Sequence, residues 1–86
     1  MKVRLFAALR EIAGASVLEL NAPDVRSLLE QLSHEFGPEF DRIMAAGAVV
    51  VDGENVGRDH RLEPGDEVAL LPPVSGGERR MSGGGT

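Results

Sequence analysis

The sequence predicts an α+β domain in which a mixed sheet of four or five strands carries one main helix packed on one face. The chain has 86 residues, which is enough for a single compact core. Short segments with the two-residue period of a β-strand stand on both sides of one segment with helical periodicity. A helix that connects two groups of strands buries its apolar side most economically against a single sheet. The other face of the sheet is therefore expected to meet water.

Two strands are expected at the start of the chain, at residues 2–7 and 16–20. The alternation of the first strand separates two sets of side chains: Val3, Leu5 and Ala7 on one face, and Lys2, Arg4 and Phe6 on the other. The second strand divides in the same way: Leu18 and Leu20 on one face, Val17 and Glu19 on the other. Because a short segment ending at Gly14 separates the strands, we expect a hairpin with a long turn.

The main helix is predicted by an apolar stripe at helical spacing, formed by Val25, Leu28, Leu29, Leu32 and Phe36. We expect Pro23 in its first turn, where the missing N–H has no intrahelical partner, and Asp24 beside the positive end of the helix. Gly37-Pro38 is expected to end the helix. One or two further helical turns before Gly47 are indicated by Phe40, Ile43 and Met44.

The remaining strands follow the helical region. Residues 48–51 are a β-branched run typical of a buried strand, and Asp52-Gly53 is a hairpin turn signal. A short irregular strand is expected before the turn at Pro64-Gly65. Residues 67–71 alternate as the last strand, which Pro72-Pro73 ends. The composition then becomes rich in Gly and Ser, which predicts a domain over residues 1–74 and a flexible tail over residues 75–86 that contains Gly76-Gly77.

Composition excludes several classes of function. The net charge is −5, with 14 acidic and 9 basic residues, which disfavours nucleic-acid binding and suits a partner with a basic surface. The absence of cysteine excludes disulfides, thiolate metal sites and a cysteine nucleophile. His34 and His60 are far apart in the sequence, so we expect surface residues and no metal site. No export segment and no apolar run of about 20 residues is seen, so a cytoplasmic protein without membrane contact is expected.

Two segments carry a resemblance to a known family. Residues 3–7 (VRLFA) and residues 65–77 (GDEVALLPPVSGG) are similar to the MoaD/ThiS-type sulfur carriers. The similarity is closest to the MoaD type, the small subunit of molybdopterin synthase, and extends over residues 1–77. The wider family includes a thiamine-pathway carrier and carriers that serve cysteine biosynthesis. The resemblance implies a β-grasp (ubiquitin-like) fold.

The resemblance also implies a mechanism centred on Gly77. An E1-like enzyme, using ATP, adenylates the carboxylate of this glycine, and sulfur then replaces AMP to give a thiocarboxylate. A partner such as the molybdopterin synthase large subunit takes the sulfur. Gly76 and Gly77 lack Cβ atoms, so their backbone can enter a narrow active site. The protein itself is thus expected to be a co-substrate without a bound cofactor or metal, and not an enzyme on its own.

Partner docking is expected on the open face of the sheet. If the first and last strands are neighbours, Phe6 and Leu71 form an exposed apolar patch beside the start of the tail. The resemblance implies that these two residues dock the activating enzyme and the synthase subunit, with Arg10 as a polar contact. A partner is also expected to bind Pro72, Pro73 and Val74, which lead from this patch to the two glycines. An alternative is that Phe6 packs against the loop after Gly57.

The chain departs from the family pattern after Gly77, because residues 78–86 follow it. An internal glycine has an amide carbonyl where a carrier needs a free carboxylate, so adenylation at Gly77 requires prior cleavage. We expect a precursor that a processing protease cuts after Gly77, for example a zinc metalloprotease of the deubiquitinase-like kind. The alternatives are an artificial tail and a relative that has lost the activity.

The leading functional hypothesis is a sulfur carrier for molybdopterin (molybdenum cofactor) biosynthesis. A carrier for cysteine or another sulfur metabolite is the second hypothesis. The third belongs to a different class, a ubiquitin-like modifier or interaction domain that binds through the open sheet face without sulfur chemistry.

Overall fold

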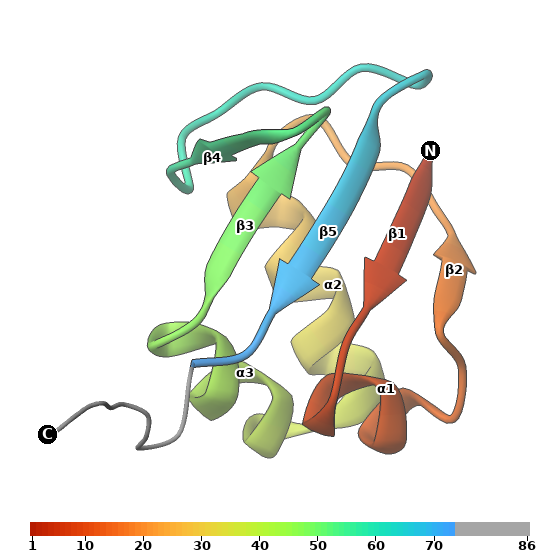
Figure 1. Cartoon of the computed structure of the whole chain (residues 1–86), viewed down its shortest axis with the longest axis vertical. Helices are drawn as coiled ribbons and strands as arrows, with labels where there is room; N and C mark the ends of the chain where they lie inside the picture. The colour runs from red at the N-terminus through yellow and green to blue at the C-terminus, as the bar shows by residue number, and fades with distance from the viewer. Residues whose placement is uncertain (74–86) are drawn as a thin grey trace, which may run out of the picture.

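The computed structural model of the chain describes residues 1–73. These residues form a five-stranded sheet with helices gathered on one side of it (Figure 1). The strands are β1 (Lys2–Leu5), β2 (Val17–Glu19), β3 (Ala48–Val51), β4 (Glu54–Val56) and β5 (Glu67–Leu71). The helices are α1 (Ala8–Ala13), α2 (Val25–Phe36) and α3 (Pro38–Ala45). The predicted α+β architecture with one main helix is confirmed.

The strand order in the sheet is β2-β1-β5-β3-β4. β1 and β5 lie side by side and parallel, with Leu5 opposite Leu70, whereas the other neighbouring pairs are antiparallel. The sheet is therefore mixed, and the two amino-terminal strands form the predicted antiparallel pair. Because β1 and β5 run in the same direction, their carboxyl ends lie at the same edge of the sheet (Figure 1).

β1 is shorter than the alternation predicts. It ends at Leu5, and Ala7 adopts a positive φ of 51°. The Phe6 carbonyl oxygen accepts a hydrogen bond from the Leu9 N–H at 3.1 Å, which turns the chain into α1. Ala7 is consequently exposed, and the prediction that it faces the core is wrong. Gly14, with a φ of 74°, ends α1 in the left-handed conformation that glycine favours.

Asp24 is the amino-terminal cap of α2. Its side-chain oxygen accepts a hydrogen bond from the Ser27 N–H at 2.8 Å. This hydrogen bond lowers the pKa of the Asp24 carboxyl from its ordinary value. Pro23 stands before the cap and not in the first turn, so that part of the prediction is wrong. Its carbonyl oxygen accepts a hydrogen bond from the Leu62 N–H at 3.0 Å.

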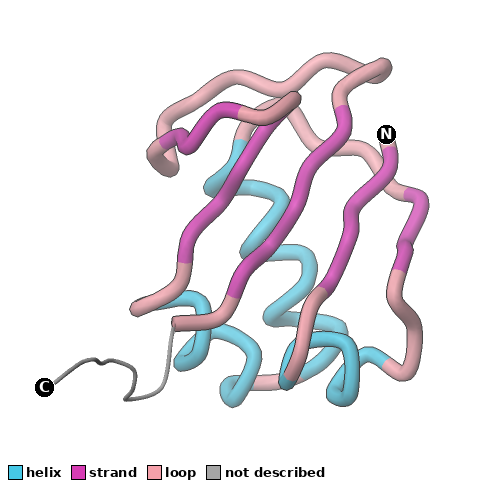
Figure 2. The backbone as a smooth tube through the Cα atoms, viewed as in Figure 1, coloured by secondary structure: helices cyan, strands magenta, loops and turns pink. Residues whose placement is uncertain are grey.

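The long connection between β4 and β5, residues 57–66, explains why the helix begins where it does. Figure 2 shows this connection as loop running past the start of α2. The N–H groups of Val25 and Arg26 donate to the carbonyl oxygens of His60 and Arg58, each at 3.0 Å. Free N–H groups at a helix start need such partners. A proline in the first turn would remove one of these donors.

Replacing Asp24 with Ala is expected to lower the midpoint temperature of unfolding at neutral pH by several degrees, because the capping bond is lost. The folded-state pKa of this carboxyl lies below its unfolded value. Its contribution to stability is therefore present above the unfolded pKa and is lost as the pH falls through the folded pKa. Thermal unfolding followed by circular dichroism should show the wild-type and variant midpoints converging below about pH 4.

Asp24→Asn is the matched control, since an amide oxygen caps a helix without titrating in this range. It is expected to stay close to the wild type at neutral pH. A deficit in Asp24→Ala that is constant from neutral to acidic pH contradicts the assignment of the cap to the ionised carboxylate.

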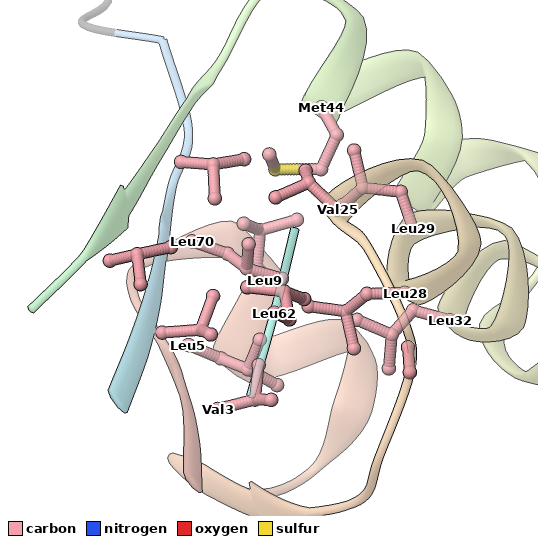
Figure 3. Packing of buried hydrophobic residues seen from close by; sticks show 14 of the residues in the cluster. Val3, Leu5, Leu9, Val25, Leu28, Leu29, Leu32, Met44, Leu62 and Leu70 are labelled. Carbon is pink, nitrogen blue, oxygen red and sulfur yellow. The ribbon is translucent and has the colours of Figure 1, made fainter. Parts of the chain in front are cut away.

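The core lies between the inner face of the sheet and the helices. Figure 3 shows Leu28 and Leu29 of α2 and Met44 of α3 among the buried side chains that pack together. The fully buried large side chains are Phe40, Leu5, Leu9, Leu28, Met44, Leu70, Val3, Val25 and Val68. The apolar stripe of the main helix is confirmed, although Phe36 at its end is only half-buried. Its ring stands 5.7 Å from that of Phe40, between centroids.

Two predicted turns are confirmed. Asp52 and Gly53 both have positive φ, 50° and 86°, in the two-residue turn between β3 and β4. Gly37 separates α2 from α3 with a φ of 98°, and Pro38 occupies the first turn of α3. Within residues 1–73, no helix has the length and apolar character needed to cross a membrane.

Candidate functional site

The face of the sheet opposite the helices changes character along the strands. The strand register defines its rows of side chains. The row at the amino end of β1 is charged: Glu19, Lys2 and Glu67. The next row is mixed: Val17, Arg4, Ala69, Val50 and Asn55. At the carboxyl ends of β1 and β5 the residues are apolar: Leu71 pairs with Ala48, and Phe6 directly follows β1. The apolar end of the face is thus the end at which the chain leaves β5.

Phe6 is the most exposed large apolar side chain of the described residues. It is 41% exposed, and Val17, also on the open face, is 39% exposed. The predicted exposure of Phe6 is confirmed. The loop after Gly57 is instead bonded to the start of α2, where the Arg26 N–H donates to the Arg58 carbonyl oxygen. Phe6 lies at the other end of β1 and does not take up the alternative position against that loop.

Leu71 is half-buried, whereas the sequence predicts it exposed. Leu5 pairs with Leu70, so Phe6 directly follows β1 beside the end of β5, whose last residue is Leu71. Ala48 pairs with Leu71 on the other side. β5 is an interior strand of the sheet, and Leu71 at its end pairs with Ala48 of β3. Its share in the apolar surface is therefore smaller than predicted.

We call the surface formed by Phe6, Leu71, Pro72 and Pro73 the root patch. Pro72 is half-buried and Pro73 is exposed. Arg10 is exposed on α1, which follows β1 at the same edge of the sheet (Figure 1). A cationic side chain thus stands at the same end of the molecule as the root patch, as a polar contact for a docked partner requires. Val74, Gly76 and Gly77 lie outside the described residues.

An ion pair that the sequence does not predict crosses the open face. Arg4 Nε donates to the Glu67 carboxylate, and both side chains are about half exposed. The hydrogen bond from Arg4, aided by its positive charge, lowers the pKa of the Glu67 carboxyl from its ordinary value. The two residues are separated by 63 positions in the sequence and are diagonal neighbours on β1 and β5. The pair belongs to the polar part of the open face, which lies toward the amino ends of β1 and β5, away from the apolar end.

Comparison with known proteins identifies the family. The family model described as "ThiS family" matches residues 3–77, most of the chain. This chain belongs to the ThiS family. The ThiS-family chain is 36% identical over 84 residues to the molybdopterin synthase sulfur carrier subunit of Escherichia coli, which covers 90% of this chain and 99% of the relative. The subunit of the same name from Dictyostelium discoideum is 30% identical over 82 residues, with coverage of 88% and 94%.

A solved structure confirms the fold of the ThiS-family chain. The small archaeal modifier protein 1 of Methanosarcina acetivorans superposes with a TM-score of 0.78 at 31% identity, covering 88% of this chain and 94% of that one. The described residues therefore have the ubiquitin-like β-grasp fold that the resemblance implies.

The residue at which the family match ends is informative. It stops at Gly77, so residues 78–86 lie beyond the part of the chain that the family shares. The described residues of the ThiS-family chain contain no group of three or more His, Cys, Asp or Glu side chains arranged to hold a metal ion. His34 and His60 are both exposed there.

Proposed function

We propose that the protein is a sulfur carrier for molybdopterin biosynthesis, activated at the carboxylate of Gly77. The observation that carries the proposal is the position of the root patch. β5 pairs with β1, and the chain leaves β5 at the apolar end of the open face. The residues matched by the family model continue past this point and end at Gly77. A partner docked on the root patch is thereby close to the segment that leads to the reacting carboxylate. The protein is a co-substrate and not an enzyme on its own.

The chemistry proceeds in two steps at this carboxylate. In an E1-like activating enzyme, a carboxylate oxygen of Gly77 attacks the α-phosphorus of ATP, and pyrophosphate leaves. Hydrosulfide from a sulfur donor then attacks the acyl carbon and AMP leaves with the C–O bond electrons, which gives the thiocarboxylate directly. The chain's own contribution is a terminus without Cβ atoms at Gly76 and Gly77, because side chains there obstruct the approach of the acyl carbon. ATP is a substrate of the activating enzyme, and the carrier binds no cofactor.

The acceptor is inferred from the relatives. The Escherichia coli and Dictyostelium discoideum proteins are named as sulfur carrier subunits of molybdopterin synthase, which supports a molybdopterin precursor as acceptor and a large synthase subunit as partner. The chain's net charge of −5 suits activating and acceptor enzymes with basic docking surfaces. A cysteine precursor is the alternative acceptor. A cytoplasmic location stays a prediction.

Release of the Gly77 carboxylate is the step that must come first. Residues 78–86 follow Gly77, and an amide carbonyl cannot be adenylated. We assign the cut to a metalloprotease that recognises the β-grasp domain and its two glycines. Mass spectrometry of the protein isolated from its own cells is expected to find a species that ends at Gly77. An exclusively full-length population in cells that make molybdopterin normally contradicts the processing step.

A protein modifier is the second candidate function. It is favoured by the likeness to the small archaeal modifier protein 1, which is named as a modifier protein. Incubation of residues 1–77 with an E1-like enzyme, ATP and a sulfur donor separates the two. A sulfur carrier gains the mass of one oxygen-to-sulfur exchange, and the product transfers its sulfur to an acceptor enzyme. A modifier instead forms amide conjugates with lysine side chains of cellular proteins, detected as branched peptides at Gly77.

A further inference from the structure

β2 is an edge strand, and in the part of the chain that the structure describes no strand lies on its outer side (Figure 1). The Ser16 carbonyl oxygen accepts a hydrogen bond from the Leu5 N–H at 2.9 Å, so the main-chain groups of Leu18, two residues on, face β1 as well. Because main-chain groups alternate in direction along a strand, those of Val17 and Glu19 point away from β1. The outer side of β2 therefore presents donors and acceptors for a further strand.

A groove of about 270 Å³ lies between this edge and the second half of α2. Gln31 Nε2 donates to the Asn21 carbonyl oxygen at 3.1 Å, which ties α2 to the segment that follows β2. Sites for whole small molecules measure about 300 Å³ or more, so this groove suits single side chains of a longer ligand. The apolar part of its lining is Leu18 and Leu20 on one side, and Leu32 and Phe36 on the other.

The charge of the lining favours a cationic ligand. Among the described residues, the carboxylates of Glu19 and Glu35 line the groove and no cationic side chain does. Glu19 lies 3.6 Å from the Met1 ammonium nitrogen but is 75% exposed, and Glu35 belongs to no ion pair of residues 1–73. A second copy of this chain is a poor occupant, because it would bring the same carboxylates and a further net charge of −5 to this edge.

We propose that the outer edge of β2 and this groove, together called the edge groove, bind an extended peptide segment in which cationic and apolar residues alternate. The peptide adds to β2 as a further strand, with main-chain hydrogen bonds to Val17 and Glu19. Apolar side chains on one side of the peptide enter the groove beside Leu18 and Phe36, and cationic side chains pair with Glu19 and Glu35. The edge groove shares no residue with the root patch, and the inference does not depend on sulfur chemistry.

The probe is a short acetylated and amidated peptide in which lysine and valine alternate. It is titrated into the isotope-labelled full chain, and binding is followed by heteronuclear NMR. The largest changes in amide shift are expected at Val17, Glu19 and Glu35, with none at Glu54 and Val56 of the opposite edge strand β4. A peptide with glutamate in place of lysine is the control for charge and is expected not to bind.

Methylation of peptide nitrogens tests the strand pairing itself. In a strand pair only alternate N–H groups of the peptide face β2, those of the lysines or those of the valines according to its direction and register. Of two peptides, one N-methylated at every lysine and one at every valine, one is therefore expected to bind about ten-fold more weakly or worse, and the other to keep most of the affinity. Charge attraction alone does not separate the two peptides.

Substitutions in the chain test the same contacts from the other side. Glu35→Gln is expected to raise the Kd of the lysine–valine peptide about three-fold, as the loss of an exposed ion pair does. Glu30→Gln is the matched control, because Glu30 is also exposed on α2 but is not part of the groove lining, and its Kd is expected to equal that of the wild type. Val17→Pro removes an outward N–H without removing a bond to β1, and it is expected to raise the Kd about five-fold.

Each outcome decides the inference. Amide shifts confined to residues outside the edge groove overturn it, as does the absence of any shift at millimolar peptide. Equal binding of the two N-methylated peptides overturns the strand pairing. Changes at Val17 and Glu19 that depend on the concentration of the chain alone mean that a second copy occupies the edge, which overturns the choice of occupant. If Val17→Pro does not fold, the N-methylated peptides make the same test on the unaltered chain.

Discussion

Replacing Gly77 with Val in the chain that ends at this residue is expected to reduce thiocarboxylate formation by about a hundred-fold or more. A branched side chain on the reacting residue collides with the walls of a channel shaped for bare backbone, and it shifts the acyl carbon away from its attack geometry. Mass spectrometry after incubation with the activating enzyme, ATP and a sulfur donor measures the loss.

Two controls accompany this experiment. Ser75→Ala changes the same segment without adding bulk at the reacting carbon, and it is expected to form thiocarboxylate at close to the wild-type rate. The chain of 86 residues is expected to form none until it is cut, because its Gly77 carbonyl belongs to an amide. A Gly77→Val chain that is charged with sulfur as fast as the wild type removes the basis of the proposed mechanism.

Local sequence patterns predict the elements of this fold well because each element satisfies local rules. The alternation around Val3 and Leu5 marks β1, and Asp52-Gly53 marks the turn between β3 and β4 through its tolerance of positive φ. The helical stripe beginning at Val25 is amphipathic enough to be read alone. In each case the information lies within a few neighbouring residues. The predicted order of strands and helix then leaves few arrangements besides the observed sheet.

The features that the sequence does not predict depend on contacts between distant segments. Pro23 stands outside α2 because the N–H groups of the first turn donate hydrogen bonds to carbonyl oxygens of the loop after β4, which a proline could not do. Leu71 is half-buried at the end of an interior strand, where Ala48 of β3 pairs with it. The sequence indicates only that a helix ends before Gly47. In the structure the Leu71 carbonyl oxygen of β5 lies so close to this residue that a Cβ atom would collide with it. Such a requirement becomes visible only when the two segments are placed together.

In the candidate site, too, some features follow from local sequence and others depend on contacts between distant segments. The family motif locates Gly76 and Gly77, and strand parity predicts an exposed Phe6, which is 41% exposed in the structure. The Arg4–Glu67 ion pair, by contrast, joins the two parallel strands and depends on their register. The register of the strands places charged side chains together at one end of the open face and apolar side chains together at the other. That polarity explains why a partner that binds the apolar end also meets the segment leading to Gly77.

Replacing Phe6 with Ala is expected to weaken binding of the activating enzyme by about 2 kcal/mol, or ~30-fold in Kd, because an aromatic side chain at the centre of a docking patch is a typical hot spot. Val17→Ala is the matched control, since the two side chains are 41% and 39% exposed on the same face, but Val17 lies away from the root patch. It is expected to change Kd less than about three-fold.

Both substitutions are expected to alter the free energy of unfolding by less than about 1 kcal/mol, since neither side chain belongs to the buried core. Isothermal titration of the 1–77 chain with an E1-like activating enzyme measures Kd, and denaturant unfolding measures stability. Equal losses of affinity in the two variants mean that the partner covers the open face evenly and has no focus at the root patch. A loss confined to Phe6→Ala places the partner at the apolar end, because only there does the docked surface adjoin the segment that carries the Gly77 carboxylate.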